Sequence, residues 1–212
     1  MLRGPARGKR WIAHSSTHGF WLGYWELENQ RRFAACLGQG DVVYDIGAHV
    51  GLYTLAASDR VGPAGHVYAF EPFSRNIAFL RRHLELNHLS NCTAVEAAVS
   101  DRAGLQYFDP TSHDSAGHLS RSGKIAVQTL SLDEFVFGSG GNRPPNAMKI
   151  NAEGAEMEVL SGGRRAILAF SPVIFLSTHS EEIDRECCEF LRSCGYLLER
   201  LASDKIWATK QG

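Results

Sequence analysis

Short apolar runs alternate with amphipathic segments along most of the chain. Val42–Ile46 and His66–Phe70 have the length and composition of buried strands, and each ends at a glycine or proline turn. Leu52–Ser58 and Ser74–Asn87 carry apolar residues at helical spacing, and we expect Ser74 to cap the second helix. This alternation predicts an α/β fold with a largely parallel sheet and helices on both faces.

The alternation resumes in the second half of the chain and ends in a hairpin. We expect a strand at Thr93–Val99, a strand at Ala147–Ile150, a helix at Ala155–Leu160, a strand at Pro172–Thr178 and a helix at Glu181–Cys194. The last two runs, Tyr196–Arg200 and Lys205–Thr209, predict a terminal antiparallel hairpin. One doubly wound, Rossmann-like domain accounts for this order of elements.

One polar insertion interrupts the order near residues 105–130. Leu105–Phe108 and Ile125–Leu130 have strand composition, and the stretch between them, Asp109–Gly123, is rich in Ser, His and Gly. This segment predicts a hairpin or a lid. Apart from the insertion, residues 41–212 are expected to form the single domain.

Residues 1–40 are expected to precede that domain as a basic arm followed by an aromatic and helical cover. Several basic residues and no acidic one occur before Glu26, which predicts a mobile terminus. The aromatic residues of the next segment either cover the open end of the core or line a substrate pocket, and core cover is the expectation. They are Trp21, Tyr24, Trp25 and Phe33.

Composition excludes several classes of protein. The 212 residues are 44% hydrophobic, enough for one domain with a full core. Lys and Arg number 22 against 23 Asp and Glu, which disfavours nucleic-acid binding because phosphate contacts need a basic surface. No apolar run approaches the ~20 residues of a membrane span. The five cysteines form neither a disulfide framework nor a metal motif, so a cytoplasmic location is expected.

The strongest chemical motif lies where the first predicted strand meets its helix. Gly47 and Gly51 let the backbone pass close under a ligand, and the helix start offers N–H groups to an anionic end. Glu71 follows at the tip of the next strand, where an acid accepts hydrogen bonds from both ribose hydroxyls. A nicotinamide dinucleotide needs glycine where this chain has His49, so S-adenosylmethionine is favoured. The candidate cofactor-binding residues of this motif are Asp45, Gly47, Ala48, His49, Gly51, Glu71 and Pro72.

Two later strand ends carry polar residues at the same predicted edge of the sheet. Ser100 and Asp101 are candidates for holding the adenine amino group, or they only cap a turn. Asn151 and Glu153 follow the next strand and are expected near the transferred group, where the Asn151 carbonyl would orient the cofactor's amino group. Glu156 begins a predicted helix, where an acid favours the helix dipole and a solvated side chain is the alternative.

Together these motifs resemble the FkbM family of S-adenosylmethionine-dependent methyltransferases, which has the seven-stranded class I fold. The resemblance rests on Gly23–Glu26, Val43–Thr54, Phe70–Pro72, Ala98–Asp101, Leu130–Asp133 and Lys149–Glu156. It implies methyl transfer, usually to a hydroxyl oxygen of a sugar or secondary metabolite. It also implies that Asp45, Gly47, Gly51 and Glu71 hold the cofactor, with Ser100 and Asp101 near its adenine.

Three positions depart from the family pattern. Asn151 stands where the family has Asp, His49 where it has Asn, and Ser177 where it commonly has Glu. Two carboxylates are therefore missing, which disfavours a metal-assisted reaction because hard cations prefer carboxylate oxygens. No metal is expected. A catalytically weakened binding protein with the same fold is the alternative to an enzyme.

Methyl transfer to a hydroxyl gains from a general base whose pKa lies near neutrality, which histidine provides. His179, after the predicted strand Pro172–Thr178, is the first candidate, with a surface or capping histidine as the alternative. Glu153 is the second candidate. The expected partner is a small-molecule acceptor, a sugar or a natural product, and a homodimer is expected by analogy alone.

Overall fold

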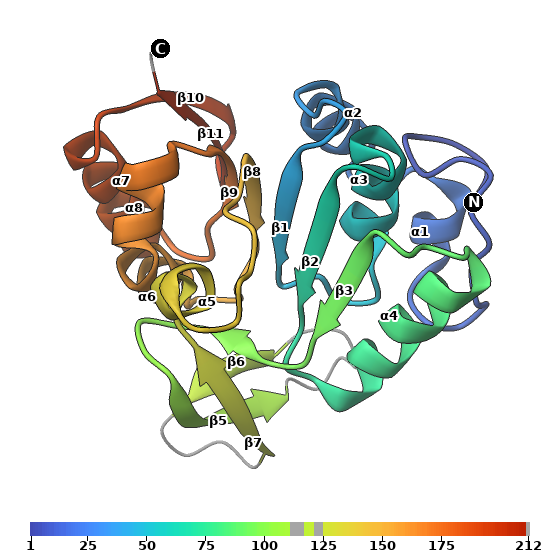
Figure 1. Ribbon diagram of the computed structural model, residues 1–212, viewed down its shortest axis with the longest axis horizontal. Helices are drawn as coiled ribbons and strands as arrows, with labels where there is room; N and C mark the ends of the chain where they lie inside the picture. The colour runs from blue at the N-terminus through green and yellow to red at the C-terminus, as the bar shows by residue number, and fades with distance from the viewer. Residues whose placement is uncertain (111–116, 121–124, 211–212) are drawn as a thin grey trace. The chain divides into compact units, whose positions relative to one another are not determined.

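The computed structural model describes residues 1–110, 117–120 and 125–210 (Figure 1). These residues fall into two compact units, Met1–Glu96 and Ala97–Gly212. The elements of the first unit are α1 (His18–Leu22), α2 (Leu27–Ala35), β1 (Val42–Ile46), α3 (Leu52–Val61), β2 (His66–Phe70), α4 (Ser74–Leu86) and β3 (Cys92–Val95).

The first unit is built on three parallel strands in the order β1-β2-β3. All five residues of β1 are buried, as expected where helical crossovers cover both faces of a parallel sheet. The bounds of β1 and β2 confirm the sequence prediction, and α3 continues to Val61, beyond its predicted end at Ser58. The sheet and its crossovers therefore bring the ends of β1 and β2 together.

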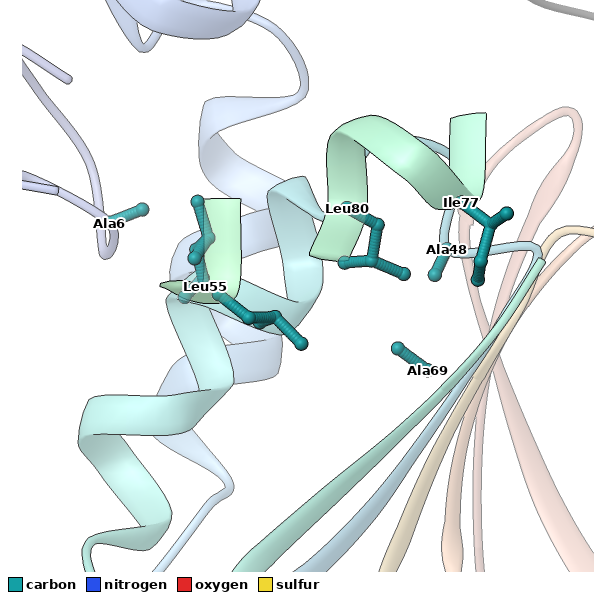
Figure 2. Close-up of a cluster of buried hydrophobic side chains, with 8 residues drawn as sticks. Ala6, Ala48, Leu55, Ala69, Ile77 and Leu80 are labelled. Atoms are coloured by element: carbon teal, nitrogen blue, oxygen red, sulfur yellow. The ribbon is translucent and has the colours of Figure 1, made fainter. Parts of the chain in front are cut away.

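A buried apolar cluster joins the helices of this unit to the loop after β1. The cluster contains Leu55 of α3, Ile77 and Leu80 of α4, Ala69 of β2 and Ala48 of the loop (Figure 2). Small side chains allow the loop backbone to lie close against the helices. The loop that the sequence assigns to a cofactor is thus held by packed core residues.

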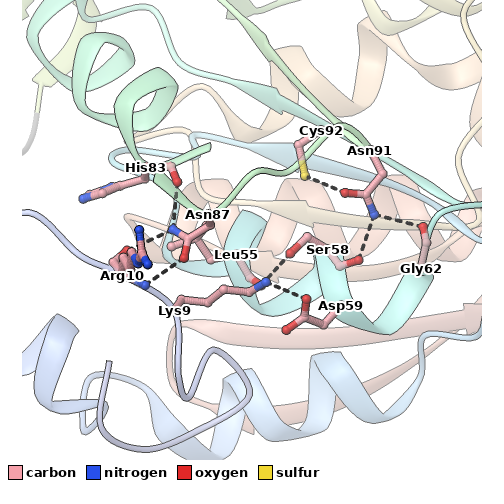
Figure 3. A network of polar contacts seen from close by, with 10 residues as sticks. All are labelled: Lys9, Arg10, Leu55, Ser58, Asp59, Gly62, His83, Asn87, Asn91 and Cys92. Carbon is pink, nitrogen blue, oxygen red and sulfur yellow. Dashed lines mark hydrogen bonds and ion pairs between the residues drawn. The ribbon is translucent and has the colours of Figure 1, made fainter. Parts of the chain in front are cut away.

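The N-terminal segment is bound to the helices of the first unit, so the prediction of a mobile terminus is wrong for residues 1–12. Lys9 Nζ contacts Asp59 Oδ1 at 2.5 Å, and the Arg10 backbone exchanges two hydrogen bonds with the Asn87 side chain (Figure 3). Ala6 is fully buried in the apolar cluster. Charge alone suggested a solvated arm, but these specific partners fix it in place.

His83 of α4 binds the N-terminal segment from the interior of the unit. It is fully buried, its Nδ1 lies 2.8 Å from the Val50 carbonyl oxygen, and its Nε2 accepts the Ile12 N–H at 3.0 Å. The Trp11 ring stacks on it at 4.1 Å between centroids. Because one ring nitrogen must donate and the other accept, His83 is neutral, and burial lowers its pKa.

We expect this histidine to weaken the fold in acid. Its folded pKa is depressed, so its contribution to stability is present above the unfolded value of 6.5 and is lost as the pH falls below it. In His83→Gln the side-chain amide provides one donor and one acceptor in place of the two ring nitrogens, but it does not titrate. Urea unfolding at pH 7.5 and pH 5 is predicted to show a smaller loss of stability for His83→Gln than for the unmodified protein. Equal losses would contradict the assignment, and His14→Gln, at an exposed position, is the control.

The aromatic segment covers the core only in part. Phe33 is buried and packs edge-on against Tyr53 of α3, with centroids 5.8 Å apart. Tyr24 and Trp25 are 55% and 50% exposed, so the prediction of core cover is wrong for them. Glu26 follows in a left-handed conformation at φ 47°, and the Tyr53 hydroxyl donates to its carboxylate at 2.9 Å.

The second unit contains two sets of four strands. Its elements are β4 (Ala98–Val99), β5 (Gly104–Pro110), β6 (Gly117–Ser120), β7 (Ile125–Leu130), α5 (Leu132–Phe137), β8 (Ala147–Ile150), α6 (Glu156–Gly162), α7 (Arg164–Phe170), β9 (Val173–Ser177), α8 (Glu181–Ser193), β10 (Tyr196–Ala202) and β11 (Lys205–Lys210). The strands β10-β11-β9-β8 are neighbours in that order, with β8 and β9 parallel and β11 antiparallel to both of its neighbours. The terminal hairpin is confirmed, and the two units together supply the seven strands of the predicted sheet.

The polar insertion and the preceding strand β4 form a separate four-stranded sheet, in the order β4-β7-β5-β6. β5 and β7 pair in antiparallel register, which confirms the predicted hairpin, and β6 adds a strand that the sequence did not indicate. The lid interpretation falls largely on residues 111–116 and 121–124, outside the described residues.

Two predictions about elements are wrong, and two helices were not predicted. The strand predicted at 93–99 is two strands, β3 and β4, which belong to different sheets, although no glycine or proline marks the break at Glu96-Ala97. Ser74 is the first residue of α4 rather than its cap, which is Phe73. The helices α5 and α7 were not predicted, since each is shorter than two full turns. No helix in the described ranges is long and apolar enough to cross a membrane.

Candidate functional site

The loop between β1 and α3 is a tight turn with repeated left-handed residues. Gly47, His49 and Gly51 have φ values of 71°, 53° and 98°. The N–H groups of Gly47 and Ala48 both donate to the Phe70 carbonyl oxygen, at 3.0 and 2.9 Å, and Gly51 N–H donates back to Ala48. Two ends of neighbouring strands therefore share one hydrogen-bonded loop.

Glu71 is the acid that fixes this loop. Its side chain is buried after β2, and its Oε2 accepts the His49 N–H at 2.9 Å. Its Oε1 accepts the Phe73 N–H at 3.0 Å and the Asn76 amide at 3.3 Å. The carboxylate thus acts at the start of α4 where a capping side chain was expected from Ser74. Its orientation is set before any ligand binds.

His49 occupies a position that few residue types accept. Its φ of 53° is left-handed, a conformation that asparagine and histidine adopt more readily than most residues. The departure from the family's asparagine therefore preserves the backbone of the turn. The His49 ring lies 5.7 Å from the Phe20 ring, which stacks on Trp25 at 5.4 Å.

Substitution of Gly51 tests how closely the loop packs against α4. A Cβ at this position would meet Leu80 Cδ1 at 2.6 Å, and its φ of +98° is unfavourable for an L residue. Gly40 has a similar φ of +91° with nothing within 4 Å of a Cβ. We expect Gly40→Ala to cost about 1 kcal/mol of unfolding free energy and Gly51→Ala about 3 kcal/mol. Equal losses in chemical denaturation would contradict the close packing of the loop against α4.

The donor and acceptor groups of the loop suit a nucleoside cofactor. Asp45 is fully buried at the carboxyl-terminal part of β1 and accepts the Thr54 hydroxyl at 2.6 Å. Glu71 offers a fixed carboxylate, which is the group that holds ribose hydroxyls in Rossmann-like folds. Pro72 follows it in the segment between β2 and α4. The residues present therefore fit a cofactor with a ribose and without a pyrophosphate.

Ser100 and Asp101 lie in the second unit, at the end of β4. Ser100 is buried, its Oγ accepts the Gln106 amide at 3.1 Å, and it lies 3.3 Å from Asp101 Oδ1. Asp101 is exposed and lies 3.8 Å from Arg102. Ser100 is engaged in the local turn, while Asp101 is exposed to solvent. An adenine contact at these residues stays a prediction.

The segment after β8 carries candidate site residues of the second unit. Asn151 and Glu153 are both half-buried, and Glu153 has a left-handed φ of 50°. Glu156 is fully buried at the start of α6, which contradicts the alternative of a solvated first-turn acid. Its Oε1 accepts the N–H groups of Ala152 and Gly154, at 2.9 and 3.2 Å.

His179 follows β9 and lies between two of these acids. Its Nδ1 is 2.8 Å from Glu156 Oε1 and its Nε2 is 3.5 Å from Glu153 Oε2. The hydrogen bond to Glu156 raises the pKa of His179 above its usual value, against the effect of burial. Both candidate proton acceptors, His179 and Glu153, are therefore brought together. Ser177, two residues earlier, is buried.

An open pocket of about 480 Å³ lies beside His179. It is lined by Thr178, His179, Ser180, Glu181, Asp184, Ser203 and Asp204. Asp184 is held by the Thr178 hydroxyl at 3.1 Å and by Arg200 at 2.7 Å. In the described part of the chain, no group of three or more His, Cys, Asp or Glu side chains is arranged to hold a metal ion.

Two residues of these clusters were missed as functional candidates. Asn76 supports Glu71 from α4, and nothing in the sequence distinguishes it from other polar helix residues. For Glu156 the sequence indicates only a favourable position at a helix terminus. Its spacing of three residues after Glu153, across Gly154, was the available signal that the segment turns back on itself.

Comparison with known proteins gives matches of three kinds. The family model described as "Methyltransferase FkbM domain" matches residues 45–198. The hexuronic acid methyltransferase AglP of Haloferax volcanii is 30% identical over 140 residues, 64% of this chain and 55% of that protein. The 31-O-demethyl-FK506 methyltransferase FkbM of Streptomyces tacrolimicus is 32% identical over 133 residues, 58% of this chain and 49% of that protein. The chain thus spans about half the length of the curated relatives it matches.

A solved structure shows the same fold. The methyltransferase FkbM of Methylobacillus flagellatus has a TM-score of 0.59 and 16% sequence identity, with 96% of this chain and 56% of that chain covered. The predicted Rossmann-like fold is confirmed by this match, and the family match covers most of the loop and strand-end residues described above.

Proposed function

Because the chain belongs to the FkbM methyltransferase family, we propose that it transfers a methyl group from S-adenosylmethionine to a hydroxyl oxygen of a small polyhydroxylated molecule. The observation that carries the proposal is the buried Glu71 carboxylate, fixed by the N–H groups of His49 and Phe73 in the matched region. The names of two relatives, a hexuronic acid methyltransferase and a 31-O-demethyl-FK506 methyltransferase, support an oxygen acceptor.

The first unit supplies the cofactor-binding residues in this proposal. Glu71 accepts the ribose hydroxyls, and the loop with Gly47, Ala48 and Gly51 lies under the cofactor's amino-acid part. Asp45 and Pro72 shape the two strand ends. S-adenosylmethionine supplies a methyl group on a positively charged sulfur.

The second unit supplies the proton chemistry. His179 lies at the wall of the pocket and takes the proton of the acceptor hydroxyl as it reacts. The lining beside it is mostly hydroxyl and carboxylate groups, which suit an acceptor with several hydroxyls. Glu153 lies close enough to His179 Nε2 to accept that proton in turn.

The proposal is tested by incubating the protein with methyl-labelled S-adenosylmethionine and a panel of sugars, uronic acids and other polyols. Label transferred to an alkali-stable ether on one class of acceptor supports it. A folded protein that binds the cofactor and transfers label to none of them, and that does not hydrolyse the cofactor slowly, would instead support a binding protein with the same fold.

A further inference from the structure

Glu156 is a fully buried acid to which the proposed function gives no role. Burying a carboxylate is costly unless the group is paired and hydrogen-bonded, and most acids in the first turn of a helix lie in solvent. Its Oε2 is buried and finds no hydrogen-bond partner among the described residues. Such an arrangement is unusual for a residue that serves packing alone.

One oxygen of Glu156 receives three donors. Oε1 lies 2.9 Å from the Ala152 N–H, 3.2 Å from the Gly154 N–H and 2.8 Å from His179 Nδ1. The two backbone donors flank Glu153 in its left-handed conformation. A single buried atom therefore connects the loop that carries one candidate proton acceptor to the side chain of the other.

The direction of the hydrogen bond fixes the state of the histidine. Oε1 already accepts two backbone N–H groups, so it also accepts from the ring, and Nδ1 of His179 carries the proton. The lone pair of the neutral ring is then on Nε2, on the side of Glu153 at 3.5 Å. The charged groups around the ring are Glu153, Glu156, Lys205 and Asp204, and Lys205 is paired with Asp204 at 2.8 Å.

We propose that Glu156 is the positioning residue of the proton-accepting site: it holds His179 in the tautomer with its lone pair on Nε2 and fixes the loop that presents Glu153. This role rests on the proposed function. When the acceptor reacts, its O–H bond breaks and the proton joins Nε2, while the oxygen's electron pair forms the bond to the methyl carbon. The methyl–sulfur bond of the co-substrate breaks in the same step, and its electron pair stays on the sulfur. The Glu156 carboxyl group keeps accepting the Nδ1 hydrogen bond and stabilises the imidazolium until Nε2 passes the proton to Glu153, as a carboxylate does beside a histidine base.

The test compares Glu156→Gln with Glu158→Gln, which removes the same charge from an exposed position on the same helix. The first readout is nitrogen NMR of the His179 ring in the protein without cofactor or acceptor. In the unmodified protein the neutral ring is expected to be protonated at Nδ1. In Glu156→Gln its pKa is expected to fall, and in Glu158→Gln it is expected to stay unchanged.

The second readout is the pH profile of methyl transfer. Glu156→Gln is expected to lower kcat by about 100-fold or more, to shift the acidic limb of kcat to lower pH, and to leave KM for the acceptor within a small factor. Glu158→Gln is expected to leave both values unchanged. A structural role alone would lower the amount of folded protein and leave the limb in place.

Two results would overturn the proposal. One is a His179 ring protonated at Nε2 in the unmodified protein, a measurement that needs no variant to fold. The other is a Glu156→Gln protein with an unchanged His179 titration. Failure of S-adenosylmethionine to bind would refute the proposed function instead, because neither NMR result depends on the cofactor.

Discussion

Replacing Glu71 with alanine is expected to abolish measurable binding of S-adenosylmethionine, with an affinity loss of at least about 100-fold. The substitution removes a charged acceptor for the ribose hydroxyls. It also leaves the His49 and Phe73 N–H groups without the carboxylate to which they donate in the buried turn. Charge-assisted hydrogen bonds are worth about 1.5–3 kcal/mol each, so the loss of two is enough for this effect. Isothermal titration calorimetry measures it.

A loss of binding must be separated from a loss of folding. Glu71→Gln keeps the size of the side chain and one acceptor oxygen, so it is expected to fold and to bind more weakly than the unmodified protein. Glu85→Ala, at an exposed position of α4, removes the same charge and is expected to bind normally. Full affinity in a folded Glu71→Ala protein would contradict the assignment of the cofactor to this loop.

Replacing His179 with alanine is expected to lower kcat by about 100- to 10,000-fold, the range for loss of a general base. Affinity for the cofactor is expected to stay within a small factor, since the cofactor-binding residues of the first unit do not include it. Stopped assays with labelled S-adenosylmethionine measure the rate, and calorimetry measures the binding. The exposed His14 provides the control substitution.

The pH dependence of the unmodified enzyme follows from the same histidine. Its pKa is raised, chiefly by the hydrogen bond to Glu156, and only the neutral ring accepts a proton. Activity is therefore expected to fall as the pH drops through a value above the ordinary 6.5. The stability of the fold depends on pH in the opposite direction to the activity. The stabilisation of the His179 imidazolium by Glu156 is fully present below pH 6.5 and is lost as the pH rises through the folded pKa. Activity that does not change across this range would count against His179 as the base.

Much of the fold and the position of the cofactor loop could be predicted from the sequence. Apolar runs ending at Gly47 and Pro72 located β1 and β2 to the residue, because buried parallel strands have a strong and simple pattern. The same spacing placed Glu71 at a strand end, where its carboxylate was found to anchor His49. These features can be predicted because they depend only on residues that are adjacent in the sequence.

Features that depend on distant partners were not predictable in the same way. The attachment of residues 1–12 needs Asp59, Asn87 and His83 in the right places, and charge counts indicated a solvated arm. The burial of Glu156 depends on His179, 23 residues later in the chain. Local sequence indicates a solvated acid in the first turn of a helix, whereas the contact with His179 places Glu156 in the protein interior.

The most direct test of the central claim is calorimetric titration of the unmodified protein with S-adenosylmethionine, and with NAD in a parallel experiment. We predict one-to-one binding of S-adenosylmethionine in the micromolar range and no heat with NAD, because the loop with His49 suits a ribose without a pyrophosphate. A protein shown to be folded that gives no heat with S-adenosylmethionine, or that binds NAD instead, would contradict the account.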